Sequence, residues 1–341
     1  MGELALAICL KEGGNINNEG KRLNNIAANA LKFISGKVKK MKIENWFSWV
    51  EATGNSGFYL IKLPYEISEL RSLNKNRIKG LSCKISQVCS KKNIDVCILP
   101  GLLEDIFECD GIFKNSFKGR LLYKSILINI IKRIYREESD VINDLDVVVI
   151  HGNDNDELLH VINILSGFVR YITLVTGCKE AVENEVSNIF ENTGLAVGIT
   201  SDNKNTLKNS HLVVNLGSLS IDFNTYSGSA STKVVINYGE TYVKNPISGN
   251  VSLIEGAIIK LPEKVLRKLE KEIFLFFNET EIAEILISSK AGAINSFCKG
   301  NLGDLSLNEL MALEFDSGGY EISGFTGKNS NIRIKNICMR V

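Results

Sequence analysis

The segment DVVVIHGNDNDELLHVINILSGFVRYITLVTGCKEAVENEVSNIFENTGLAVGITSDNKNTLKNSHLVVNLG, from Asp146 to Gly217, decides the fold. Four apolar runs in it have the length and composition of strands: 146–150, 171–175, 195–199 and 211–216. Helical patterns occupy 157–168 and 179–192. Strands that alternate with helices at this spacing predict parallel βαβ units, and all-apolar strands suit a sheet covered on both faces. We therefore expect a Rossmann-like domain here.

The flanking sequence supplies further elements. Strands are expected at 2–10, 58–63, 94–99, 233–238 and 256–260. Helices are expected at 19–34, 73–90, 117–135, 265–289 and 306–315. Ser306, followed three residues later by Glu309, matches a capping box for the last of these helices. A Ser/Gly/Thr-rich stretch at 226–232 is typical of an exposed loop.

These elements predict an α/β protein with two domains, in keeping with a length of 341 residues. The expected parts are an N-terminal α/β domain (1–116), a linking helix (117–140), a Rossmann-like domain (141–262), C-terminal helices that pack back on the first domain (263–325) and a loose tail (326–341). In such an arrangement a ligand binds at the carboxyl ends of the parallel strands.

Composition excludes several classes of function. The chain has 40 Lys and Arg against 39 Asp and Glu, so no overall basic charge indicates a nucleic acid or an anionic membrane as partner. No apolar run reaches the roughly 18 residues of a membrane span. The eight Cys form no CxxC pair and the three His stand at no ligand spacing from them, so we expect no metal site. Scattered cysteines of this kind indicate reduced thiols in a cytoplasmic protein.

The turn after the first strand of the Rossmann-like domain is where a dinucleotide would bind, and it reads His151, Gly152, Asn153, Asp154, Asn155, Asp156. It holds one glycine where a GxGxxG loop has three, so the backbone freedom that lets such a loop approach phosphates is reduced. We expect Asp156 to cap a helix that begins at Glu157, which would place a carboxylate in the anion site.

Several segments together resemble the shikimate-dehydrogenase-like proteins that include the long-chain acyl-(acyl carrier protein) reductases. They are Gly57–Pro64, Pro100-Gly101, Leu253–Ala257, Gly300–Leu310 and Gly319–Phe325, and their order matches from about residue 1 to 325. The resemblance implies a Rossmann fold, NAD(P) as cofactor, and an acyl carrier protein among the partners. The basic helix from Leu73 to Lys92 is a candidate for docking such an acidic partner, or simply a solvated face.

The resemblance also implies site residues, and the chain departs from them. Phe276 stands where the family has the cysteine that takes the acyl group, and a phenyl ring is no nucleophile. Glu279 matches a carboxylate of the family. Asn115 and Ser116 match a Gly-Asn-Ser turn in which Lys114 replaces the glycine.

Other residues offer alternatives that the sequence leaves open. Thr176 and Lys179 follow the second strand, where no acid is present to bind a ribose, and Lys179 suits either a 2′-phosphate or a solvated helix face. His151 suits acid–base chemistry or an ordinary turn. Cys298, beside Lys299, suits a reactive thiol or plain packing.

The sequence therefore favours a diverged reductase-type protein, with catalysis lost or altered, that acts as a binding, regulatory or partner protein. The NAD(P) cofactor would then bind weakly or not at all. The alternative is an active NAD(P)H-dependent oxidoreductase that uses a rearranged phosphate loop on an acyl thioester, aldehyde or keto acid. A third hypothesis is a binder of some other small molecule.

Overall fold

The structure, a computed structural model, describes residues 3–9, 42–53, 56–107, 111–115, 118–135, 142–152, 154–202, 206–208, 210–217, 219–221, 233–239, 241–243, 251–292, 305–327 and 331–332. Several predictions lie outside these residues: the helix at 19–34, the loop at 226–232, Ser116, Asn153 and Cys298.

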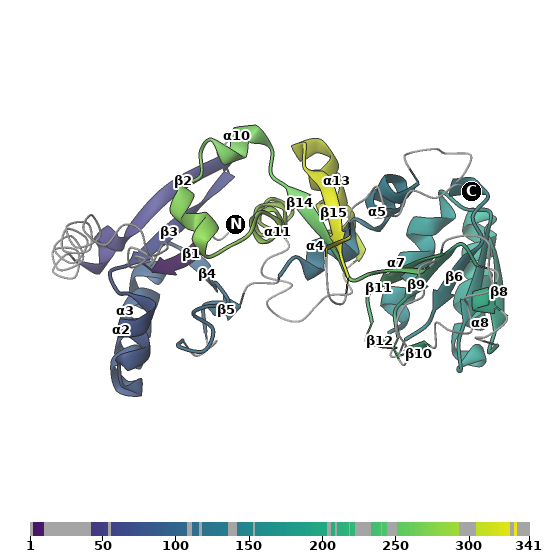
Figure 1. Cartoon of the computed structure of the whole chain (residues 1–341), viewed down its shortest axis with the longest axis horizontal. Helices are drawn as coiled ribbons and strands as arrows, with labels where there is room; N and C mark the ends of the chain where they lie inside the picture. Colours follow the sequence, from purple (N-terminus) through teal and green to yellow (C-terminus); the bar gives the residue numbers. More distant parts are fainter. Residues whose placement is uncertain are drawn as a thin grey trace, which may run out of the picture. The chain divides into compact units, whose positions relative to one another are not determined.

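The chain divides into two compact units (Figure 1). The first comprises Met1–Lys118 and Leu261–Asn301, and the second comprises Gly119–Lys260 and Leu302–Val341. The sequence prediction assigned 263–325 as a whole to the first domain. The structure divides that stretch, with helix α11 (Glu279–Lys290) in the first unit and helix α13 (Leu305–Gly318) in the second.

The first unit contains a five-stranded sheet. In spatial order its strands are β2 (Phe47–Thr53), β3 (Ser56–Leu63), β1 (Glu3–Cys9), β4 (Ile94–Leu99) and β5 (Phe113–Asn115). Only the β2–β3 pair is antiparallel. Helices α2 (Ile67–Ser72) and α3 (Lys75–Lys91) connect β3 to β4. Strand β2 is not among the expected strands, although Val50 and Ala52 alternate as buried residues with exposed neighbours.

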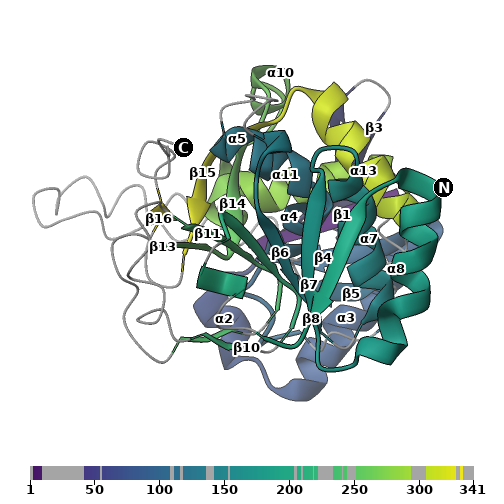
Figure 2. The ribbon, with the colours of Figure 1, turned by 90° about the vertical axis from the view of Figure 1, so that its right-hand side faces the viewer.

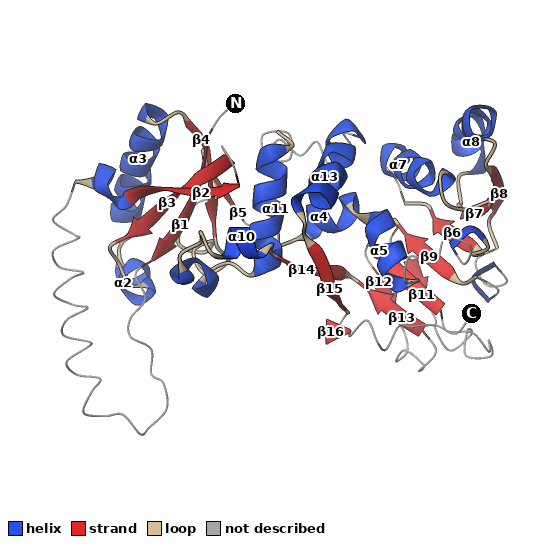
Figure 3. Cartoon of the chain, turned by 90° about the horizontal axis from the view of Figure 1, so that it is seen from above, coloured by secondary structure: helices blue, strands red, loops and turns tan. Residues whose placement is uncertain are grey.

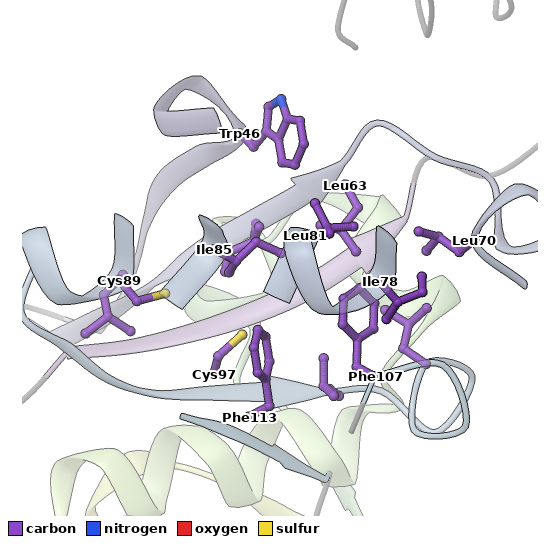
Figure 4. Close-up of a cluster of buried hydrophobic side chains, with 14 residues drawn as sticks. Trp46, Leu63, Leu70, Ile78, Leu81, Ile85, Cys89, Cys97, Phe107 and Phe113 are labelled. Carbon is purple, nitrogen blue, oxygen red and sulfur yellow. The ribbon is translucent and has the colours of Figure 1, made fainter. Parts of the chain in front are cut away.

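One face of α3 supplies much of the core of this unit, as Figure 4 shows. Ile78, Leu81 and Ile85 pack against the sheet at helical spacing, as the sequence predicts. Cys89 and Cys97 are buried in the same cluster as free thiols. Burial raises the pKa of Cys89 to about 12 and that of Cys97 well above its usual value, so these two thiols stay protonated packing groups.

The second unit contains a six-stranded sheet in which every pair is parallel. In spatial order its strands are β13 (Val251–Ile254), β11 (Lys233–Asn237), β9 (Leu212–Asn215), β6 (Val147–Ile150), β7 (Tyr171–Val175) and β8 (Ala196–Thr200). Numbered along the chain with β6 as the first, and taken across the sheet from β8 to β13, this order is 3-2-1-4-5-6, that of the Rossmann fold. The α/β fold class expected from the sequence is confirmed.

Helices α7 (Asn155–Ser166) and α8 (Lys179–Thr193) follow β6 and β7 and lie on the same side of this sheet (Figures 2 and 3). Residues of alternate positions on five strands form a buried cluster with Leu207: Val148, Ile150, Val175, Val213, Val235, Val251 and Leu253. Branched aliphatic side chains on central parallel strands explain why these segments read as unbroken apolar runs.

One strand of the expected Rossmann-like domain (141–262) lies outside the parallel sheet. The strand expected at 256–260 is β14 (Gly256–Lys260), but it belongs to a separate antiparallel sheet with β15 (Glu321–Thr326) and β16 (Asn331–Ile332). The parallel sheet is completed by β13 instead. Asn331 and Ile332, expected in a loose tail, pair with β15.

Two long predicted helices are divided. The helix expected at 117–135 forms α4 (Arg120–Ser125) and α5 (Leu127–Ile134), with a break at Ile126. It begins later than predicted because Lys118 and Gly119 both have positive φ, which no helix accommodates.

The helix expected at 265–289 forms three pieces: α10 (Glu263–Leu266), the 3-10 helix η3 (Lys271–Leu275) and α11. Asn278 starts the last piece, because its side chain accepts the Glu281 N–H while the Glu281 carboxylate accepts the Asn278 N–H. In α13 the helix begins at Leu305, so Ser306 lies inside its first turn and is not the N-cap.

Candidate ligand site at the carboxyl edge of the parallel sheet

The carboxyl ends of β6 and β9 mark the point where the strand order of the six-stranded sheet reverses. Connections leave the sheet in opposite directions at such a switch point, and ligands of doubly wound folds bind there. The sheet hydrogen bonding continues one residue past each strand: the His151 N–H donates to the Val175 carbonyl at 2.9 Å, and the Leu216 N–H donates to the Ile150 carbonyl at 3.0 Å. The residues that follow are therefore held in register.

Three glycines bring the backbones at this edge into direct contact. A Cβ added to Gly152 would lie 2.6 Å from the Leu216 carbonyl oxygen, and one added to Gly217 would lie 2.8 Å from the His151 carbonyl oxygen. A Cβ on Gly239 would lie 2.0 Å from the Gly217 carbonyl oxygen. The glycine of the β6–α7 turn is thus required for packing against the turn after β9, whatever its role toward a phosphate.

A buried pair of amides joins β9 to β11 at the same edge. The Asn215 side chain is fully buried, and its Nδ2 donates to Asn237 Oδ1 at 2.8 Å. Its Oδ1 accepts the Gly217 N–H at 3.2 Å, which fixes the turn after β9. Sequence reasoning missed this pair. The signal was present, because an asparagine follows three apolar residues at the end of each of two strands, where a buried polar group needs a partner.

The N-terminus of α7 carries a carboxylate, but it is not the one predicted. The helix begins at Asn155, and Asp154 is its N-cap. Asp154 Oδ1 accepts the Asp156 N–H at 3.0 Å and the Glu157 N–H at 3.2 Å. The prediction that Asp156 caps a helix beginning at Glu157 is wrong, because the extended backbone of Asp154 starts the helix two residues earlier.

Acidic side chains therefore surround this helix start. Asp156 and Glu157 lie in the first turn, beside the cap. Helix α4 lies close to Glu157, since Lys124 pairs with it. On the same helix, Arg120 Nη2 donates to the Tyr238 carbonyl at 3.2 Å. The Lys124 pair balances one of the three acidic groups.

The neighbouring turn, between β7 and α8, is built differently. Cys178 is at the N-cap position of α8 but its side chain makes no capping hydrogen bond. Lys179 follows as the first helical residue, 64% exposed, and pairs with Glu183 one turn on at 3.5 Å. Gly177 has open space around it, where an added Cβ would contact nothing within 4 Å.

His151 and Thr176 meet across the two turns. His151 Nδ1 lies 3.1 Å from Thr176 Oγ1, and that oxygen accepts the Cys178 N–H at 3.0 Å. The other ring nitrogen of His151, Nε2, is buried and has no hydrogen-bond partner in the described part of the chain. Of the residues proposed from the sequence for cofactor binding, these two are in direct contact.

The residues that the resemblance implied for catalysis lie in the first unit. Phe276 packs against the hydrophobic core cluster beside α3. Glu279 begins α11, and its Oε2 accepts the Leu261 N–H at 2.9 Å, so this carboxylate joins a helix to the preceding segment. Asn115 ends β5, opposite Leu99. Phe276 and Glu279 therefore have structural contacts that explain their presence.

Among the described residues, no three His, Cys, Asp or Glu side chains gather in a way that would hold a metal ion. None of the helices there is both long and apolar enough to cross a membrane.

No protein-family model matches the chain, and no curated protein matches it. Solved structures resemble it only distantly. A Granulicella formate dehydrogenase is 9% identical, with 46% of this chain and 47% of that chain covered and a TM-score of 0.25. Quinate dehydrogenase from Corynebacterium glutamicum, in complex with NAD, is 9% identical, with 69% and 79% covered and a TM-score of 0.26.

An N-acetyl-L-ornithine transcarbamylase is 8% identical, with 73% of this chain and 83% of that chain covered and a TM-score of 0.29. At such scores and identities the likeness carries no argument about chemistry. The Rossmann-type assignment of the second unit therefore rests on its own strand order.

Proposed function

We propose that this chain is a diverged protein of Rossmann type that acts as a binding, regulatory or partner protein and does not perform hydride transfer with NAD(P)H in the usual way. One observation carries the proposal. The Asp154 carboxylate accepts the Asp156 and Glu157 N–H groups at the start of α7, where a Rossmann protein binds the pyrophosphate of its cofactor.

The donors and the charges at this helix start both oppose a diphosphate. Two N–H groups that would bind a phosphate already bind a carboxylate. A second negative charge about 4 Å from the first costs roughly 4 kcal/mol at an effective dielectric constant near 20, which is about a thousandfold in affinity. Asp156 adds another charge on the same turn, so the residues do not fit a dinucleotide pyrophosphate.

The alternative is an active NAD(P)H-dependent oxidoreductase on an acyl thioester, aldehyde or keto acid. The strand order of the second unit and the polar His151–Thr176 pair at its switch point support this alternative. Phe276, which packs against a core cluster, speaks against the thioester route, since that position offers no nucleophile.

Calorimetric titration with NADPH and NADH tests the proposal. The wild-type protein should show no saturable binding at micromolar cofactor, whereas Asp154→Ser keeps a capping oxygen, removes the charge and should strengthen NADPH binding by at least tenfold. Asp144→Asn is the matched control. Asp144 precedes β6 and pairs through its exposed carboxylate with Arg170, so its replacement should leave the titration unchanged. Micromolar binding of NADPH by the wild-type protein would disprove the proposal.

A protein partner is a separate part of the proposal. Helix α3 carries Lys75, Arg77, Lys79, Lys84 and Lys91 and no acidic residue, and all five cationic side chains are exposed. An acidic protein such as an acyl carrier protein would complement this face. If so, the complex weakens steeply with salt, and Lys79→Glu with Lys84→Glu abolishes it in a fluorescence-anisotropy titration. Unchanged affinity of the double variant would remove α3 from the interface.

A further inference from the structure

The hydrogen bonds around His151 favour one position for its ring proton. Thr176 as a whole residue is 5% exposed, and its hydroxyl oxygen already accepts the Cys178 N–H. Its own hydrogen needs an acceptor, and His151 Nδ1 lies 3.1 Å away. A buried hydroxyl that donates to Nδ1 leaves the ring proton of the neutral imidazole on Nε2. His151 then presents a buried N–H donor at the switch point of the sheet.

That donor has no acceptor in the described protein. A buried donor without a partner costs about 1–3 kcal/mol, so such groups call for an explanation. The other histidine at an edge of this sheet differs: His211 Nδ1, at the amino ends of the strands, accepts the Asp146 N–H at 3.1 Å. His151 is the histidine whose unused group lies where ligands of this fold bind.

We propose that His151 is a ligand-contacting residue whose Nε2–H donates to a carbonyl or hydroxyl oxygen of a small uncharged molecule bound at the carboxyl edge of β6 and β7. Thr176 is the positioning residue that holds the imidazole in the donating tautomer. The ligand carries no phosphate near this point, because the carboxylates of Asp154 and Asp156 lie at the start of α7 and would repel it. This ligand class rests on the proposed function.

The tautomer is tested first, without any ligand, in the wild-type protein. Two-bond proton–nitrogen NMR spectra of ¹⁵N-histidine-labelled protein at pH 8.5 resolve the three histidines of the chain. We expect the His151 proton on Nε2. Thr176→Val removes the hydroxyl and should convert the ring to a mixture of tautomers, and Thr176→Ser should restore it. A wild-type His151 with its proton on Nδ1 overturns the proposal.

Adenosine, AMP and ADP are then the probes, because they share one uncharged portion and differ in phosphate number. Adenosine should shift the His151 Nε2 resonance and leave His211 unchanged, and each added phosphate should weaken binding by at least tenfold. His151→Gln should weaken adenosine binding at least tenfold, and the control His211→Gln should not.

The two proposals fail in different ways. If adenosine leaves the His151 resonance unmoved, or if ADP binds more tightly than adenosine, the inference about His151 is wrong. A titration of the same wild-type sample with NADPH is the separate test of the proposed function. Absence of binding by both NADPH and adenosine would therefore leave the proposed function standing and disprove only the ligand contact of His151.

Discussion

The turn after β6 and the turn after β7 stand side by side on one sheet, and each leads into a helix, yet they are built on opposite principles. In the first turn, Gly152 packs against the backbone after β9. Asp154 caps α7 with its carboxylate, and acidic residues follow in the first turn of the helix. In the second turn, Gly177 has open space around it, and Cys178 at the N-cap position of α8 makes no side-chain capping bond. Lys179 is the first residue of that helix. Topology therefore does not make a helix N-terminus an anion site; the residues at its first turn decide that.

The helices that follow differ in the same way. The buried face of α8 holds only aliphatic residues, Val182, Val186 and Ile189, whereas that of α7 includes His160. His160 is 7% exposed, and burial lowers its pKa from the usual 6.5 to about 4.

The largest expected effect comes from His160. As pH falls from 6.5 toward 4, the unfolded chain binds a proton on this ring and the folded protein does not, so stability present above pH 6.5 is lost. The loss is about 3 kcal/mol over that window, at roughly 1.4 kcal/mol per pH unit. Urea unfolding of the wild type and of His160→Leu at several pH values measures it. Equal pH dependence of the two proteins would mean that His160 binds its proton as readily in the folded protein as in the unfolded chain.

The two glycines give the next effect. Gly152→Ala forces a Cβ against the Leu216 carbonyl oxygen at 2.6 Å, where backbone must move, and should cost about 2 kcal/mol. Gly177→Ala meets open space and should change stability by less than about 0.5 kcal/mol. Thermal unfolding of both variants makes the comparison, and equal losses would remove the contrast between the turns.

The caps give a smaller effect. Asp154→Ala leaves the Asp156 and Glu157 N–H groups without their acceptor and should cost about 1 kcal/mol, while Asp154→Ser keeps most of the stability. Cys178→Ala removes no capping bond and should be neutral within about 0.3 kcal/mol. Chemical denaturation resolves these differences. A costly Cys178→Ala would show that α8 is capped after all.

The exposed lysine gives the smallest effect. Lys179→Ala breaks an exposed pair with Glu183 and should change the free energy of unfolding by less than about 0.5 kcal/mol. The hypothesis of a 2′-phosphate contact at Lys179 makes a different prediction. If Asp154→Ser gains affinity for NADPH over NADH and Lys179→Ala erases that preference, Lys179 binds the phosphate; without such a change it is a solvated residue.

The periodicity of apolar residues predicts most of the helices and strands but not which strands pair with one another. Five of the six strands of the parallel sheet are mainly apolar, since their central residues are buried, and the sequence therefore predicts them; β13 is the strand that it does not predict. The strand at 256–260 was found, but not its sheet, because β14 pairs with β15, more than sixty residues away. A pairing over that separation leaves no local pattern. The Asn278 and Glu281 capping pair is a local signal that divides the helix expected at 265–289.

The sequence by itself determined the α/β class, the run of βαβ units and the presence of acidic residues where a phosphate loop would have glycines, because period and residue type are local properties of a chain. Only the tertiary structure decided which carboxylate caps α7, that three glycines hold the strand ends together, and that His151 faces Thr176 with Nε2 unpartnered. Those facts depend on distances between segments far apart along the chain, which packing sets and residue order alone does not record.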